Sequence, residues 1–296
     1  MWRKRLVPLL AGCAGVLALV LDIRAPVYAD HGAPEAVITG AGAHFAWVIF
    51  DRLRFDLEKV AGHPIKLYGR NSTLGMGCNA GIKTALQNRP HHQTFGFVCC
   101  PLDEDEVKRK KLRVYPIAVE PILIVVNQDN PVHDLSAEQV RAMMRGDIVN
   151  WKEVGGLDEP VVVVTRLHCK KRPGHWKTIL PEAGEFRSQR LNVSSAGDMV
   201  QRVGDFRGAL GHIGSTWDFG PGSHVRAITV GGVAPTADNL RSGRYPFFRQ
   251  LAAVTNEHPS REVLAIIREV QQGPAFRRVA ARYQLLPAAE PGKPAP

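Results

Sequence analysis

The sequence predicts an α/β fold made of two lobes. Short apolar segments alternate with amphipathic segments along most of the chain, as strands and helices do in α/β proteins. Two further segments, Pro121–Asn127 in mid-chain and Phe247–Thr255 near the end, have the apolar character of buried strands. A chain that crosses twice between two lobes needs two such segments. We therefore expect a two-lobed fold with a double hinge and a ligand cleft between the lobes.

The first third of the chain alternates strands and helices. Val37–Thr39 is typical of a short strand, and it runs into a glycine-rich turn. A helix is predicted over Phe45–Val60, because apolar side chains recur there at helical spacing and Gly62 follows the last of them. The next strand, helix and strand are expected at Ile65–Tyr68, Ile82–Leu86 and Thr94–Val98.

The middle of the chain continues this alternation. Ser136 followed by Gln139 is a capping box that predicts a helix start, and Val161–Val164 is a buried strand. We expect lobe 1 to comprise residues 30–125 and 229–286, with lobe 2 inserted as residues 126–228. The Pro- and Ala-rich residues 287–296 are predicted to be a disordered tail.

The N-terminus has the pattern of an export signal. Trp2–Arg5 is basic, Leu6–Leu21 is almost entirely apolar, and Val27–Ala29 offers small residues to a signal peptidase. Residues 1–29 are therefore predicted to be a signal peptide, and the mature protein is expected to be periplasmic. A membrane anchor and a lipid on Cys13 are the alternatives.

Charge and cysteine content narrow the function further. The net charge is +10, which suits either a solvated basic surface or the attraction of anionic ligands. No basic run is interleaved with aromatic residues, which argues against nucleic acid as a partner. The cysteines beyond the predicted leader are Cys78, Cys99, Cys100 and Cys169. Their even number permits disulfides in an oxidising compartment.

Several motifs in a fixed order suggest one family. They are Thr39–Phe45, Gly75–Lys83, Leu135–Val140, Arg145–Gly156, Gly211–Gly214 and Gly243–Pro246. Together they resemble the substrate-binding proteins of phosphate ABC transporters, which are type II periplasmic binding proteins. The resemblance covers nearly all of the chain after the leader.

The resemblance implies a ligand site formed by helix N-termini and an arginine. Backbone amides at a helix start, together with the helix dipole, favour an anion. Arg166 directly follows a predicted strand, where an open α/β sheet binds its ligand, and a guanidinium binds an oxyanion through two hydrogen bonds. The ligand-binding residues implied in this way are Ala43, His44, Phe45, Cys78, Asn79, Cys99, Arg166, Cys169, Gly174 and His175.

The side chains at these positions depart from the family pattern. His44 replaces a small hydroxyl residue, Cys78 replaces a serine, and Cys99 stands where the family has an aspartate. Thiolates and imidazoles are soft donors that suit copper, zinc or a trivalent arsenic species better than phosphate. We therefore expect a metal-ligand set of His44, Cys78, Cys99 and Cys169. A disulfide from Cys78 to Cys99 or Cys100, or a role in the core, would explain the thiols without a ligand.

The leading functional hypothesis is a binding protein that is not an enzyme. It would capture a small inorganic ion, an oxyanion or an arsenite-like or soft metal ion, for a membrane permease or a sensor histidine kinase. We expect a monomer with no resident cofactor apart from a soft metal ion. A true phosphate-uptake protein is one alternative, since Arg166 and the scaffold suit phosphate. A periplasmic thiol enzyme is an alternative of another class.

Overall fold

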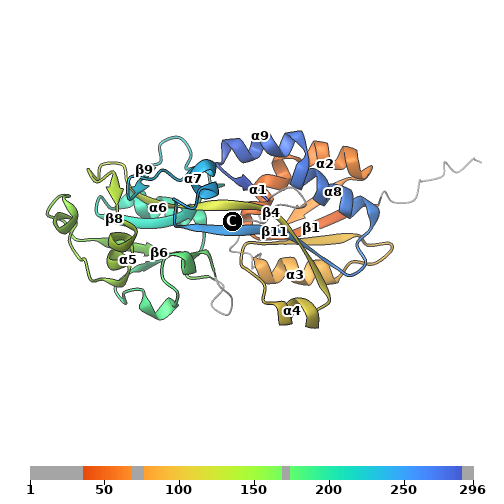
Figure 1. Ribbon diagram of the computed structural model, residues 1–296, viewed down its shortest axis with the longest axis horizontal. Coiled ribbons are helices and arrows are strands. Elements are labelled where there is room, and N and C mark those ends of the chain that lie inside the picture. Colours follow the sequence, from red (N-terminus) through yellow and green to blue (C-terminus); the bar gives the residue numbers. More distant parts are fainter. Residues whose placement is uncertain (1–35, 69–76, 169–173, 289–296) are drawn as a thin grey trace, which may run out of the picture. The chain divides into compact units, whose positions relative to one another are not determined.

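The computed structural model describes residues 36–68, 77–168 and 174–288, which form an α/β fold (Figure 1). The strands are β1 (Ile38–Gly42), β2 (Ile65–Tyr68), β3 (Thr94–Val98), β4 (Leu112–Asn127), β5 (Asp134–Leu135), β6 (Val162–Thr165), β7 (Leu191–Asn192), β8 (Ala209–Gly214), β9 (Val225–Ala227), β10 (Thr229–Val230), β11 (Phe248–Asn256) and β12 (Leu286–Pro287). A mixed sheet has the order β2-β1-β3-β11-β4-β8-β6-β7, and β9 and β12 also pair with β4. The remaining strands, β5 and β10, pair with each other.

Helices flank this sheet. The α-helices are α1 (His44–Arg52), α2 (Arg54–Ala61), α3 (Cys78–Leu86), α4 (Glu104–Arg109), α5 (Ala137–Arg145), α6 (Ala196–Asp205), α7 (Ala237–Arg241), α8 (Arg261–Gln272) and α9 (Pro274–Arg282). Short 3-10 helices are η2 (Trp151–Val154), η3 (His175–Thr178) and η4 (Ala183–Glu185). Helices α2, α8 and α9 lie on one side of β1 and β11, with α3 and α4 on the other (Figure 1). The predicted α/β class is confirmed.

The long helix predicted over Phe45–Val60 is in fact two helices. Helix α1 ends at Arg52, and Leu53 (φ −98°, ψ −1°) interrupts the helix before α2 begins at Arg54. The apolar periodicity does not reveal this break, because Leu53 and Leu57 are both buried on the core side. The helix start at Ser136 is confirmed, since its side chain and that of Gln139 form the predicted capping box.

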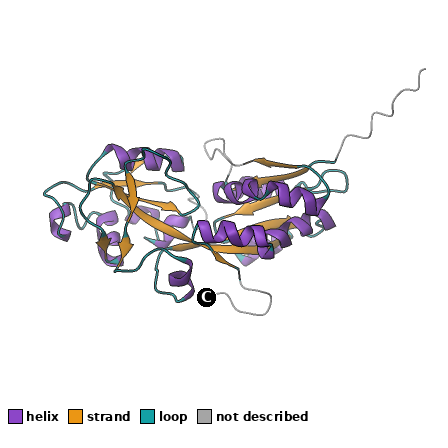
Figure 2. Ribbon diagram, turned by 90° about the horizontal axis from the view of Figure 1, so that it is seen from above, coloured by secondary structure: helices purple, strands orange, loops and turns teal. Residues whose placement is uncertain are grey.

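The two crossing segments expected from the sequence are β4 and β11. They pair antiparallel with each other over most of the length of β11 and form the longest strands in Figure 2. β4 contributes to two separate hydrophobic clusters, whereas β11 contributes to the first and Phe247, directly before it, to the second. In β4, Ala118 packs in the first cluster and Val119 in the second, and in the late segment the change falls between Phe247 and Leu251. The two long strands therefore join two cores.

The lobe boundaries themselves stay a prediction. Residues of segment 229–247, among them Val230 and Phe247, are buried in the second cluster, although the predicted boundary placed them in lobe 1. At the other end, Pro287 pairs with Ala118, and the Ala288 amide donates to the Ile117 carbonyl at 2.8 Å. The fold thus extends into the start of the predicted tail.

The predicted leader, 1–29, and residues 289–296 lie outside the described residues. Within the part of the chain that the structure describes, no helix has the length and apolar character needed to cross a membrane.

Two glycines bring α3 unusually close to β3. A Cβ atom added to Gly96 would collide with the carbonyl oxygen of Gly81, and one added to Gly81 would lie 2.6 Å from the Phe97 oxygen. Both obstacles are backbone atoms, which cannot rotate away. This close packing brings Cys78, at the start of α3, beside Cys99, which directly follows β3.

Gly96→Ala should therefore lower stability. Overpacking of this kind costs about 1–3 kcal/mol, because the helix must move away from the strand. Urea unfolding of the two proteins measures the loss. Gly184→Ala is the matched control, since a Cβ at Gly184 meets no atom within 4 Å. Equal losses for both variants would contradict the close-packing argument.

Candidate functional site

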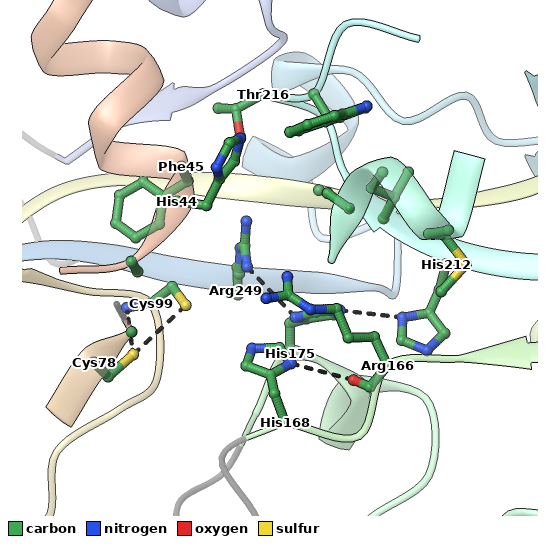
Figure 3. Close-up of a pocket in the computed structure, with 17 residues that line it drawn as sticks. His44, Phe45, Cys78, Cys99, Arg166, His168, His175, His212, Thr216 and Arg249 are labelled. Carbon is green, nitrogen blue, oxygen red and sulfur yellow. Dashed lines mark hydrogen bonds between the residues drawn. The ribbon is translucent and has the colours of Figure 1, made fainter. Parts of the chain in front are cut away.

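A small pocket lies at the carboxyl ends of β1, β3 and β6, where open α/β sheets bind ligands. Its volume is about 50 Å³. One water needs ~10–15 Å³ on this measure, so the pocket has room for a few waters or one small ion. Figure 3 shows Cys78 and Cys99 on one side and Arg166, His168 and His212 on the other. The lining residues are Ala43, His44, Phe45, Gly77, Cys78, Cys99, Arg166, His168, His175, Ala196, Met199, His212, Ile213, Gly214, Thr216, Trp217 and Arg249.

Two helices begin at this pocket without a capping side chain. Ala43 is the N-cap of α1 and Gly77 the N-cap of α3, and neither has a side chain that can accept a hydrogen bond from the first turn. Among the other described helices, α4, α5, α6, α7 and α8 each begin with an Asp, Ser or Thr side chain that caps a first-turn amide, while α2 and α9 also lack such a cap but do not begin at the pocket. The positive ends of α1 and α3 thus face the pocket, where they favour an anion.

Arg166 brings a cationic side chain to the pocket from the opposite side. It directly follows β6, as the sequence predicted, and its Nε donates a hydrogen bond of 3.0 Å to the Ser194 carbonyl. This bond uses the Nε–H and fixes the direction of the guanidinium group, which lines the pocket. A guanidinium held in this way suits a charge-assisted contact to an oxyanion.

A buried ion pair forms the floor of the site. Glu120 of β4 and Arg249 of β11 are direct cross-strand partners, and the Arg249 Nε donates to a Glu120 carboxylate oxygen. Glu120 is fully buried, and its second oxygen accepts from the Thr216 amide (2.9 Å) and hydroxyl (2.6 Å). Gly214 permits this packing, since an added Cβ would lie 2.5 Å from both Arg249 Nη2 and Glu120 Oε1.

The pair sets the charge of Arg249. Burial is the largest influence and would lower the pKa of Arg249, but the Glu120 carboxylate, together with Cys99 and Cys100, outweighs burial and raises that pKa above its ordinary value. Arg249 therefore stays cationic, with its charge neutralised within the protein. Its guanidinium carbon also lies 5.4 Å from the centre of the Phe45 ring, a cation–π contact that holds it against the start of α1.

A row of histidines extends from Arg249. Arg249 Nη1 lies 3.4 Å from His175 Nδ1, and His175 Nε2 lies 3.2 Å from His212 Nδ1. Because a guanidinium can only donate, His175 Nδ1 is the acceptor, and its Nε2–H donates to His212. His212 then carries its proton on Nε2, which has no hydrogen-bond partner among the described residues. The His168 ring packs beside His175, with 4.7 Å between ring centres.

The imidazole rings of His175 and His212 are neutral at pH 7. Burial is the main cause, and the nearby His168, Arg249 and Arg166 act in the same direction. They hold the pKa of His175 well below its ordinary value and lower the pKa of His212 to about 3. The positive character of the pocket thus comes from arginine and helix dipoles, while these imidazoles offer neutral hydrogen-bonding groups.

Three thiols gather beside the pocket. Cys78 Sγ lies 3.6 Å from Cys99 Sγ and accepts a hydrogen bond from the Cys99 amide at 3.2 Å. The sulfurs of Cys78, Cys99 and Cys100 all lie within 4.8 Å of one another, and no disulfide joins them. The bridge from Cys78 to Cys99 or Cys100 considered from the sequence is therefore not formed.

Of the residues that the sequence predicted for the site, seven line this pocket, namely Ala43, His44, Phe45, Cys78, Cys99, Arg166 and His175. Two described ones do not. Asn79 is exposed in the first turn of α3, and Gly174 is the N-cap of η3, packed against Trp176. Of the predicted metal-ligand set, Cys78 and Cys99 lie together, but the third residue beside them is Cys100 and not His44. Cys169 lies outside the described residues.

The sequence prediction missed Glu120, Arg249, Thr216 and His212. Glu120 and Arg249 did carry a signal, because each is a charged residue in or next to an apolar strand segment. A charge in a buried strand needs a partner, and two such charges of opposite sign suggest each other. Thr216 and His212 carried no signal of this kind.

Comparison with known proteins places the chain in a family. A family model described as a PBP superfamily domain matches residues 71–271. The chain belongs to the PBP superfamily. The phosphate-binding protein PstS of Bacillus subtilis is 27% identical over 148 residues, 49% of this chain and 48% of that protein. PstS of Borreliella burgdorferi is 23% identical over 236 residues, 75% of this chain and 79% of that protein. The first match thus spans about half of its relative's length.

Two solved structures share the fold of this chain. A substrate-binding protein from Clostridium perfringens, solved with bound phosphate, has a TM-score of 0.72 at 23% identity, covering 86% of this chain and 100% of that one. An ABC-type phosphate transport receptor from Vibrio cholerae has a TM-score of 0.62 at 24% identity, covering 85% and 99%. The predicted type II fold is confirmed.

Glu120→Gln tests the buried pair of this PBP-superfamily protein. Removing one partner leaves the Arg249 charge buried without its counter-ion, which typically costs about 3–5 kcal/mol. The free energy of unfolding from urea titration at pH 7.5 measures this cost. Asp158→Asn is the matched control, because Asp158 and Lys152 form an exposed pair, for which the loss is about 1 kcal/mol or less. A comparable loss in both variants would contradict the role given to Glu120.

The neutral histidines predict a dependence of stability on pH. Above pH ~6.5 a histidine ring is neutral in both the folded and the unfolded chain. As pH falls below that value the unfolded chain takes up protons that folded His212 refuses, down to its pKa of about 3. Each such ring lowers the free energy of unfolding by roughly 1.4 kcal/mol per pH unit.

His212→Asn keeps an acceptor for the His175 Nε2–H and removes this titration. Unfolding measured between pH 6.5 and 5 should show a mean slope shallower by roughly 1 kcal/mol per pH unit than that of the unaltered protein, since the unfolded histidine is only half protonated at pH 6.5. Above pH 7 the difference in stability between the two proteins should be constant. Parallel slopes across the acidic range would refute the neutral state of His212.

Proposed function

We propose that this protein is an extracytoplasmic solute-binding protein that captures a small oxyanion of the phosphate type for an ABC transporter. The observation that carries this proposal is the convergence of two uncapped helix N-termini and Arg166 on one ion-sized pocket. Similarity to proteins named for phosphate binding supports it. The described lining residues include no Asp or Glu, so no carboxylate among them repels a fully ionised oxyanion.

The missing carboxylate also bears on which oxyanion binds. Glu120 lies behind the pocket, and its oxygens are occupied by Arg249 and Thr216. Cys99 stands where the family resemblance implies an aspartate. A carboxylate that accepts a proton from the ligand would reject an anion without one, because its lone pairs would meet the anion's oxygens. This pocket therefore accepts sulfate as well as phosphate and arsenate.

Binding, not catalysis, is the proposed activity. The relatives are named for what they bind, and this supports a non-enzyme. The predicted leader supports export, so the proposed partner is a membrane permease. A sensor histidine kinase is the other partner, and neighbouring genes for a permease and an ATPase, or for a kinase, would separate the two roles.

A thiophilic cargo is a second candidate, because Cys78 and Cys99 line the same pocket. A trivalent arsenic species binds thiols and has no need of Arg166 or of helix dipoles. The two cargoes therefore differ in which side of the pocket they use, and one set of variants distinguishes them.

Calorimetric titration of the reduced protein with phosphate, sulfate, arsenate and arsenite tests the proposal. Arg166→Gln should weaken binding of the three tetrahedral oxyanions at least about tenfold, since a charge-assisted hydrogen bond contributes about 1.5–3 kcal/mol. Arg268→Gln, an exposed arginine on α8, is the matched control and should change nothing. Binding of arsenite alone, unaffected by Arg166→Gln but lost in Cys99→Ser, would overturn the oxyanion assignment in favour of the second candidate.

A further inference from the structure

The three gathered thiols come from two structural elements. Cys78 is the first residue of α3, and Cys99 and Cys100 directly follow β3, so the close packing of α3 on β3 brings them together. All three are buried, with exposed fractions of 1%, 4% and 1%. Their side chains are thus held in place by the core on both sides.

The geometry is that of a metal-binding site. Sulfurs bound at ~2.3 Å to one metal ion lie roughly 3.8–4.0 Å apart, in tetrahedral or trigonal geometry. The Cys78 and Cys99 sulfurs are 3.6 Å apart, and all three sulfurs lie within 4.8 Å of one another. Small side-chain rotations that move each sulfur by a few tenths of an ångström therefore suffice to bring all three within bonding distance of one ion.

The donor set favours a soft, monovalent ion. Among the described residues no His, Asp or Glu joins the three sulfurs. An all-thiolate set selects soft ions, and Cu(I) is stable with two or three thiolates, so these three sulfurs suffice to bind it. We propose that Cys78, Cys99 and Cys100 together bind one Cu(I) ion.

Two cavities border the cluster. Cys78 and Cys99 line the oxyanion pocket. Cys100 lines a second cavity of about 360 Å³, formed with Pro101, Leu102 and Gln250. The thiol cluster therefore borders a cavity other than the oxyanion pocket.

Copper binding changes the charge beside the pocket. Three neutral thiols lose three protons and bind one Cu(I), with no change in oxidation state, so the cluster goes from neutral to a net charge of −2. The helix dipole at Cys78 and the nearby Arg249 charge favour these thiolates. The same negative charge repels an oxyanion in the adjoining pocket. Copper and oxyanion therefore weaken each other's binding, and by linkage they do so by the same factor.

Titration of the reduced protein with Cu(I), in anaerobic competition with the chromophoric chelator bathocuproine disulfonate, tests the site. One Cu(I) per chain should be withdrawn from the chelator. Cys100→Ser should weaken copper binding at least about tenfold, the scale on which even outer-shell changes act. It should leave oxyanion binding intact, because Cys100 does not line that pocket. An unchanged thermal midpoint confirms that the variant is folded.

Met144→Leu is the matched control, since it removes a buried sulfur of the second hydrophobic cluster at nearly constant volume, and copper binding should be unchanged. Copper that is retained after all three cysteines are replaced by serine, or lost in Met144→Leu, would overturn the site. Binding of Zn²⁺ but not Cu(I) would overturn the choice of metal.

The coupling rests on the proposed function, and a separate measurement tests it. Phosphate affinity of the Cu(I)-loaded protein should fall at least about fivefold relative to the metal-free reduced protein, the low end of usual coupling energies. Equal affinities in the two states would contradict the coupling. Phosphate binding in neither state would sink the proposed function, while one Cu(I) per chain would still establish the metal site.

Discussion

The buried pair of Glu120 and Arg249 is the interaction on which the rest of the site depends. It joins β4 to β11 close to where β4 passes from one hydrophobic cluster to the other, between Ala118 and Val119. Two charges in such a place are costly to remove from water, so the surrounding groups must satisfy them. Thr216 binds the carboxylate and His175 accepts from the guanidinium. The crossing strands and the pocket thus share one set of hydrogen bonds.

The pairing with Glu120 explains why Arg249, although it lines the pocket, adds little to the attraction of an anion. Arg249 is satisfied within the protein and orients the histidine row, so His175 donates outward to His212. Arg166 reaches the pocket from the other side, and the described lining residues include no carboxylate there. The electrostatic attraction for an anion therefore comes from Arg166 and the starts of α1 and α3.

The sequence predicted the architecture better than the chemistry of the site. Strands at Ile65–Tyr68 and Thr94–Val98 were predicted to the residue, because apolar composition and turn residues mark them locally. The break at Leu53 and the pairing of Glu120 with Arg249 depend on contacts distant in sequence, which local patterns do not encode. The place of Cys100 in the thiol cluster was not predicted for the same reason, because the packing of α3 on β3 decides which sulfurs lie close together.

A crystal structure of the reduced protein grown with phosphate tests the central claim most directly. The account predicts one tetrahedral anion in the pocket, with oxygens on the first-turn amides of α1 and α3 and on the Arg166 guanidinium. Glu120 should remain bound to Arg249 and Thr216, without contact to the anion. An anion located elsewhere, or a pocket that holds only water at saturating phosphate, would contradict it.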